Sequence, residues 1–126
     1  MEAMNEHQGP PPYPRATIRL QFRKEFTFAD ARELVPYFAQ LGVSHIYASP
    51  VLMARPGSTH GYDIVDHNHF NPEIGTEESF SDLCRTLHEH GMGLIMDFVP
   101  NHMGVGAADN EWWLDVLEWG KNSPFA

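Results

Sequence analysis

The 126-residue chain is long enough for one modest domain with a hydrophobic core, and its 42% hydrophobic and 20% charged residues are ordinary for a globular protein. Its formal net charge of −9 argues against a nucleic-acid partner, which would need a basic face, and its single cysteine excludes an internal disulfide. No stretch approaches the roughly 18 apolar residues of a membrane span. These features suit a neutral substrate such as a sugar.

Residues 1–14 are polar and rich in proline, three of them consecutive. This composition predicts a disordered or extended tail. The segment has neither the basic region nor the apolar run of a secretory signal. We therefore expect a cytoplasmic protein whose ordered part spans residues 15–126.

Residues 16–22 alternate between apolar and polar side chains and predict a strand. Thr27 and Asp30 have the spacing of a capping box, and the apolar residues that follow recur at helical spacing. Pro36 interrupts this helix, so we expect a kink or a restart there. Gly42 suits the position just after the helix.

The rest of the chain continues the alternation of strands and helices, separated by glycine and proline. We expect a second strand over 43–49, a long loop over 50–75, a helix from Thr76 to Gly91, a third strand over 94–97, and a last helix from Asn110 to Gly120.

This order predicts an α/β fold with a parallel sheet. Two architectures fit: a small doubly wound sheet, or part of a TIM-type (β/α)8 barrel. The glycine fingerprint of dinucleotide-binding folds is missing after the first strand. Because a whole barrel needs about 250 residues, the chain would hold only its N-terminal part, about three β/α units, and would be incomplete at the C-terminus.

Polar side chains directly follow the apolar third strand. Asp97 ends that strand, Pro100 prevents further pairing, and Asn101 and His102 begin a loop. Ligands bind at the carboxyl ends of strands in β/α folds, so we expect these three polar residues at a functional site. The alternative is that Asp97 caps the loop and Asn101 makes a turn.

The predicted 50–75 loop carries a second candidate group, His60, Tyr62 and Asp63, next to Gly61. An aromatic ring between a histidine and an aspartate is a reasonable platform for a sugar, because the ring offers its face and the polar groups bond hydroxyls. The alternative is that Tyr62 packs against neighbouring elements and Asp63 caps a turn.

The histidines also permit a zinc-hydrolase hypothesis, built on His67 and His69 with His60 and His102 nearby. The spacing is loose and no His-Glu-x-x-His motif is present, so we predict no metal. The three tryptophans, in a helical context, favour core or interface packing over sugar stacking; these are Trp112, Trp113 and Trp119.

Several of these segments, in order, resemble the α-amylase superfamily: the 97–102 segment, Ser49-Pro50 and Gly61-Tyr62-Asp63. More narrowly, three segments resemble the maltooligosyltrehalose synthase family, from about Pro14 to the end of the chain. They are Arg19-Leu20-Gln21, the string from Ala54 to Asp63, and Trp112-Trp113 before Asp115.

The resemblance implies an intramolecular transglycosylase of the cytoplasm. Its members convert the reducing-end α-1,4 bond of a maltodextrin into an α,α-1,1 bond, on the route to trehalose. It further implies that Tyr62 stacks on the glucose next to the scissile bond, with His60 and Asp63 at that subsite. His102 would contact the hydroxymethyl group of the same sugar, and Asp97 would organise the strand end.

Asn101 matches a position that ligates calcium in many α-amylases, but these synthases are not generally regarded as calcium enzymes, so we expect no cofactor. The nucleophile, the general acid and the third carboxylate of the superfamily come from strands four, five and seven, which this chain lacks. We therefore expect no catalytic residue here and no activity of the chain alone. It would bind a maltooligosaccharide and the missing part of the barrel.

Two other functions stay open at this point. The chain could be part of an α-glucan hydrolase of the same superfamily, or a carbohydrate-binding α/β domain without catalysis.

Overall fold

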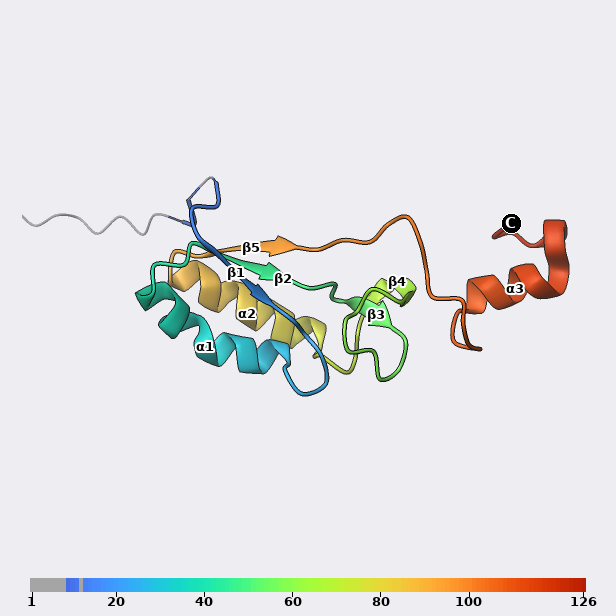
Figure 1. The fold of residues 1–126 in the computed structure, drawn as a ribbon, viewed down its shortest axis with the longest axis horizontal. Helices are drawn as coiled ribbons and strands as arrows, with labels where there is room; N and C mark the ends of the chain where they lie inside the picture. Colours follow the sequence, from blue (N-terminus) through green and yellow to red (C-terminus); the bar gives the residue numbers. More distant parts are fainter. Residues whose placement is uncertain (1–8, 12) are drawn as a thin grey trace, which may run out of the picture.

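The computed structural model describes residues 9–11 and 13–126 (Figure 1). Its main sheet has three parallel strands in the order β1-β2-β5: β1 (Thr17–Leu20), β2 (His45–Ala48) and β5 (Gly93–Met96). The three predicted strands and their parallel arrangement are thus confirmed. The predicted disordered tail over residues 1–14 lies mostly outside the described residues.

Helices α1 (Phe28–Gln40) and α2 (Glu77–Glu89) cover one face of this sheet (Figure 1). The predicted capping box opens α1, since the Thr27 side chain accepts from the Asp30 N–H and the Asp30 carboxylate accepts from the Thr27 N–H at 2.8 Å. The predicted restart at Pro36 is wrong: α1 is one helix, held through this point by the buried Val35 and Phe38 on either side. No helix within the described residues is long and apolar enough to cross a membrane.

The hydrophobic core lies between the sheet and these two helices. Leu20, Ile46 and Ala48 point into it from the strands, as the alternation along a strand requires. Phe28, fully buried at the start of α1, contacts the rings of Phe22, Phe70 and Phe80 at centroid distances of 5.1, 6.0 and 5.2 Å. These contacts join the carboxyl end of the sheet to the segment that follows β2.

That segment is not the long loop predicted over residues 50–75. It contains a hairpin of two antiparallel strands, β3 (Leu52–Ala54) and β4 (Ile64–Phe70), joined by the loop 55–63. The strand β4 was missed because Asp66, His67, Asn68 and His69 follow one another without apolar alternation. The hairpin stands at the carboxyl ends of β2 and β5 and carries the loop residues to that edge (Figure 1).

The chain then runs away from the sheet to α3 (Glu111–Trp119) and a 3-10 turn (Gly120–Asn122), at the far end of an elongated molecule (Figure 1). Asn110 caps α3 as predicted, because its side chain accepts from the Trp113 N–H at 3.0 Å. No residue of α3 is buried, so the tryptophans form no core here. The Trp112 ring instead stacks on Phe125 at 5.6 Å.

Candidate functional site

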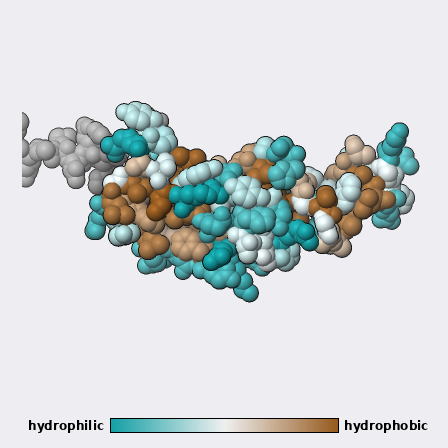
Figure 2. Space-filling model, in the orientation of Figure 1, coloured by the Kyte–Doolittle hydropathy of each residue, from teal (hydrophilic) through white to brown (hydrophobic). Residues whose placement is uncertain are grey.

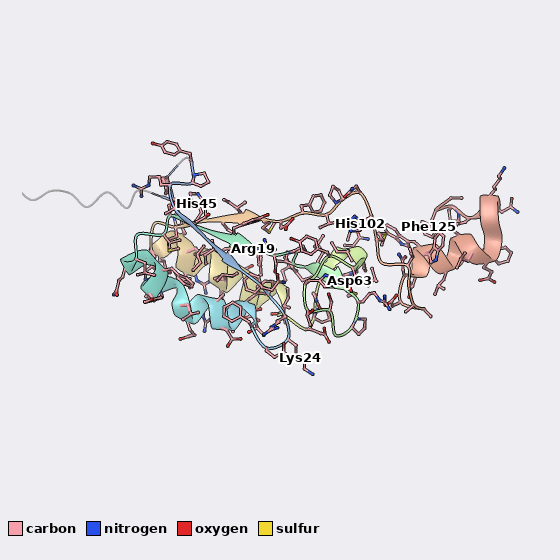
Figure 3. The ribbon with its side chains drawn as sticks, viewed as in Figure 1. Arg19, Lys24, His45, Asp63, His102 and Phe125 are labelled. Carbon is pink, nitrogen blue, oxygen red and sulfur yellow. The ribbon has the colours of Figure 1, made fainter. Side chains whose placement is uncertain are left out.

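Three segments meet at the carboxyl end of the sheet: β1 with Arg19, the hairpin loop 55–63, and the segment that follows β5. Figure 3 shows Arg19 on β1, and His102 beside the hairpin that carries Asp63. The sheet register explains the meeting, because Arg19 pairs with Tyr47 in β2, and Tyr47 with Ile95 in β5. Asp97 follows two residues later, with its N–H donated to the carbonyl of Ala48.

Tyr62 is hydrogen-bonded to a group on β1 and to one in the segment that follows β5. Its hydroxyl donates to Oδ2 of Asp97 and accepts from Nη2 of Arg19 at 2.9 Å. Arg19 Nη1 lies 3.6 Å from the same carboxylate oxygen. The hydrogen bond to Asp97, aided by burial, raises the pKa of the Tyr62 phenol; the Arg19 charge opposes this only in part.

The loop that carries Tyr62 is built around Ser58 and Gly61. The Ser58 hydroxyl donates to Oδ1 of Asp63 at 2.5 Å and accepts from the Gly61 N–H at 3.0 Å. Gly61 has φ +79°, and a Cβ there would lie 2.8 Å from the Pro50 carbonyl oxygen. Only glycine meets both conditions, so the loop conformation depends on this residue.

The two site histidines hold the backbone of Tyr62. The Tyr62 N–H donates to Nδ1 of His60 at 3.0 Å, so the neutral ring carries its proton on the exposed Nε2. The His60 ring stacks on the Tyr62 ring with centroids 6.0 Å apart. On the other side, His102 Nε2 donates to the Tyr62 carbonyl at 3.2 Å.

The structure thus brings five of the six predicted residues into one group, namely His60, Tyr62, Asp63, Asp97 and His102. Asn101 is exposed, and within the described residues its side chain makes no hydrogen bond to this group.

Three further residues make contacts in the site that the sequence did not predict. These contacts depend on the sheet register and on the conformation of the hairpin loop. The three residues are Arg19, Ser58 and Gln21, whose side-chain amide donates to the His60 carbonyl at 3.1 Å.

An ion pair between Arg55 and Asp109 fixes the segment that follows His102. Arg55 Nε, in the hairpin loop, donates to Oδ2 of Asp109 at 2.9 Å. The chain passes close to the Arg55 side chain at Gly106, where an added Cβ would lie only 2.9 Å from Arg55 Nη1. Gly104 N–H also donates to the Ile64 carbonyl at 2.7 Å. The 97–109 segment is therefore tied to the hairpin at both ends.

An apolar hollow of about 300 Å³ adjoins Asp97. His67, Phe70, Met96 and Phe98 are among its lining residues. His67 Nε2 donates to the Val99 carbonyl at 2.9 Å, which keeps this histidine from ligating through that nitrogen.

The described residues hold no group of three or more His, Cys, Asp or Glu side chains that could bind a metal ion. His69, part of the zinc hypothesis, instead bonds Asp66 at 2.6 Å. No such group lies near Asn101 within this part of the chain.

A comparison with protein-family models matches residues 31–123 to the family described as "Alpha amylase, catalytic domain". Among curated proteins, one from Mycobacterium tuberculosis (strain ATCC 25618 / H37Rv), provisionally named maltooligosyl trehalose synthase, is 47% identical over 117 residues, which is 88% of this chain and 15% of the relative. A maltogenic alpha-amylase of Bacillus acidopullulyticus is 36% identical over 93 residues, 74% of this chain and 15% of that protein.

Among solved structures, the maltooligosyltrehalose synthase from Arthrobacter ramosus is 46% identical to this chain and superposes with a TM-score of 0.87. The match covers 90% of this chain and 15% of that structure. The chain therefore spans about 15% of the length of the relatives that it matches.

Proposed function

The chain belongs to the α-amylase catalytic-domain family, and from this we propose that it supplies the first β/α units of a maltooligosyltrehalose synthase barrel. Residues 15–126 would form the N-terminal portion of a (β/α)8 catalytic domain. The reaction is an isomerisation: the reducing-end α-1,4 bond of a maltodextrin becomes an α,α-1,1 bond. The choice of a synthase over an amylase is supported by 46–47% identity over 88–90% of this chain, whereas amylases are 36–42% identical over 53–74% of it.

One observation carries the sugar-site assignment: the structure holds Tyr62 at three separate points. Its hydroxyl is bonded to Arg19 and Asp97, its N–H to His60, and its carbonyl to His102. A ring fixed in this way loses little freedom when a ligand binds, which favours affinity. We assign the Tyr62 ring as the platform for the glucose next to the scissile bond.

The histidines would bond that glucose through the nitrogens that face away from Tyr62. The free Nε2–H of His60 is a donor on a side chain that is 54% exposed. Because His102 Nε2 donates to the Tyr62 carbonyl, the Nδ1 of the same ring can accept a hydrogen bond from the sugar. The two side chains can thus offer a donor and an acceptor to sugar hydroxyls.

The carboxylates near the platform are already used as acceptors within the chain. Asp97 accepts from Tyr62, and Asp63 accepts from Ser58. Burial tends to raise the pKa of Asp66, but the hydrogen bonds from Asn68 and His69 outweigh it and lower that pKa, which does not suit a general acid.

Retaining chemistry needs two carboxyl groups about 5–5.5 Å apart, one as nucleophile and one as acid and then base. We propose that both come from parts of the whole enzyme other than residues 1–126. The base step would activate the 1-OH of the released glucose, which attacks in place of water. The role of the chain is then to bind and orient the sugar, and we expect no bound metal to take part.

The test is a hybrid enzyme in which residues 9–126 replace the matching segment of the Arthrobacter ramosus synthase. The hybrid should convert maltopentaose to a non-reducing product, whereas the 126-residue chain alone should give no turnover above a heat-treated control. Release of glucose or maltose instead would indicate a hydrolase. A hybrid without turnover, beside an active parent enzyme, would contradict the proposal.

A further inference from the structure

We propose that Arg19 of β1 is a positioning residue, which fixes the Tyr62 ring and the Asp97 carboxylate for the sugar. The role rests on the proposed function, because it assigns the support of the same subsite. Arg19 itself is not proposed to touch the reacting atoms.

Arg19 contacts the two key groups with separate arms of its guanidinium, Tyr62 by a hydrogen bond and Asp97 by an ion pair. Nη2 donates to the Tyr62 hydroxyl at 2.9 Å, and Nη1 lies 3.6 Å from Oδ2 of Asp97. The Tyr62 hydroxyl closes the triangle by donating to the same Asp97 oxygen. Three chain segments, β1, the hairpin loop and the end of β5, are therefore joined at one point.

The guanidinium is itself held in place by β2. Its Cζ lies 4.7 Å from the centroid of the Tyr47 ring, the residue that pairs with Arg19 in the parallel register. Stacking on an aromatic face, together with a hydrogen bond from one arm and an ion pair from the other, favours arginine over lysine, whose ammonium is a single point of charge. The Arg19 side chain is 37% exposed and Asp97 18%, so the pair faces the open site and not the core.

Arg19 is also the source of positive charge for Asp97. Within the described part of the chain, the ion pair with Arg19 is the only one that Asp97 makes. Without Arg19, the Tyr62 hydroxyl would keep one partner in place of two, and the carboxylate would carry its charge without a cation. Both groups could then move away from the orientation that the sugar requires.

The experiment compares kcat and KM for maltopentaose in the hybrid enzyme carrying Arg19→Met, Arg19→Lys, Tyr62→Phe, or Arg19→Met with Tyr62→Phe. We expect Arg19→Met to lower kcat/KM about tenfold and Arg19→Lys about threefold, from the usual worth of a charged hydrogen bond at a partly exposed site. In the Tyr62→Phe background, Arg19→Met should cost less than about threefold, because the Tyr62 hydroxyl is already gone and only the ion pair with Asp97 remains to be lost.

Arg23→Met is the matched control. Arg23 follows the same strand, is 50% exposed and pairs with Glu25, away from Tyr62. It should leave kcat/KM within about twofold, and all variants should keep the thermal midpoint within about 2 °C. If Arg19→Met does not fold, Arg19→Lys beside Arg23→Lys gives the same comparison.

An equal loss for Arg19→Met in both backgrounds, or a loss that follows a lowered thermal midpoint, would overturn the positioning role and leave the proposed function standing. A loss no greater than that of Arg23→Met would do the same. A hybrid inactive before any substitution would instead contradict the proposed function, and the role of Arg19 with it.

Discussion

At the scale of single residues, the ring of Tyr62 should matter more for sugar binding than its hydroxyl. We expect Tyr62→Phe to lower kcat/KM of the hybrid about tenfold, because the ring stays and only its anchor is lost. Tyr62→Ala should cost at least a further tenfold, since no face remains for the sugar. Steady-state kinetics on maltopentaose measure both. Equal losses would mean that the hydroxyl, and not stacking, is what matters.

The titration of Tyr62 gives a test without substrate. Its pKa is raised by the hydrogen bond to Asp97, so the phenol should lose its proton above the usual value of about 10. The stability that this bond contributes is present below the pKa of the unfolded chain and is lost as the pH rises through the folded value. Tyrosinate absorbance of the hybrid, taken as a difference from Tyr62→Phe, measures the midpoint. Asp97→Asn should lower it, and an unchanged midpoint would exclude the bond.

Most of the candidate site residues can be recognised in the sequence because of the residues that flank them. Asp97 and His102 follow an apolar strand, and Tyr62 lies beside a glycine in a polar loop, so each is marked by its own neighbours. The part played by Arg19 could not be found in this way, because it depends on the register of three strands and on the path of the hairpin loop. Asn101 was marked by its position alone, and the structure gives it no partner among the described residues.

At the scale of elements, capping signals and apolar spacing predict α1, α2 and α3, but the same patterns predict a loop where the structure has the β3–β4 hairpin. The helices were found because Thr27, Thr76 and Asn110 each accept from a backbone N–H in the first turn. The strand β4 cannot be predicted from local patterns, because its second half is polar and its register with β3 is irregular. Its position depends on the contact between Phe28 and Phe70, which no local pattern shows.

The cap of α1 supports a prediction at this scale. Thr27→Ala should weaken the first turn of α1 by about 1 kcal/mol, which corresponds to roughly fivefold faster amide exchange there. Hydrogen exchange of the hybrid, followed by mass spectrometry, measures this. Thr17→Ala is the control, because Thr17 is exposed on β1 and makes no side-chain hydrogen bond within the described residues. Equal exchange in both variants would contradict the role of the cap.

The same cap should weaken in acid. The N–H and hydroxyl of Thr27 lower the pKa of Asp30, so the bond is fully present above the unfolded value and is lost as the pH falls through the folded one. Relative to the intrinsic exchange rate at each pH, exchange in the first turn should therefore rise in this acid range in the unmodified hybrid and change less in Asp30→Asn.

At the scale of the whole molecule, the chain leaves much apolar surface open. β1 and β5 are edge strands, and α1 and α2 cover only one face of the sheet (Figure 1). Figure 2 shows hydrophobic side chains gathered around α3, where Leu117 is 62% and Trp119 57% exposed. Open edges and apolar patches of this kind favour association.

We therefore expect the 126-residue chain, produced alone, to self-associate despite its net charge of −9. Size-exclusion chromatography with light scattering measures this directly. A monodisperse monomer with a cooperative melt would instead favour a self-sufficient small α/β domain.

The sugar subsite formed by Tyr62 and its neighbours can be seen directly in a crystal structure of the hybrid enzyme with maltopentaose, in a variant whose nucleophile carboxylate, outside residues 1–126, is replaced so that the sugar is not converted. We expect a glucose ring stacked on Tyr62, with His60 Nε2 and His102 within hydrogen-bonding distance of its hydroxyls. A sugar bound elsewhere, with Tyr62, His60 and His102 uncovered, would contradict it.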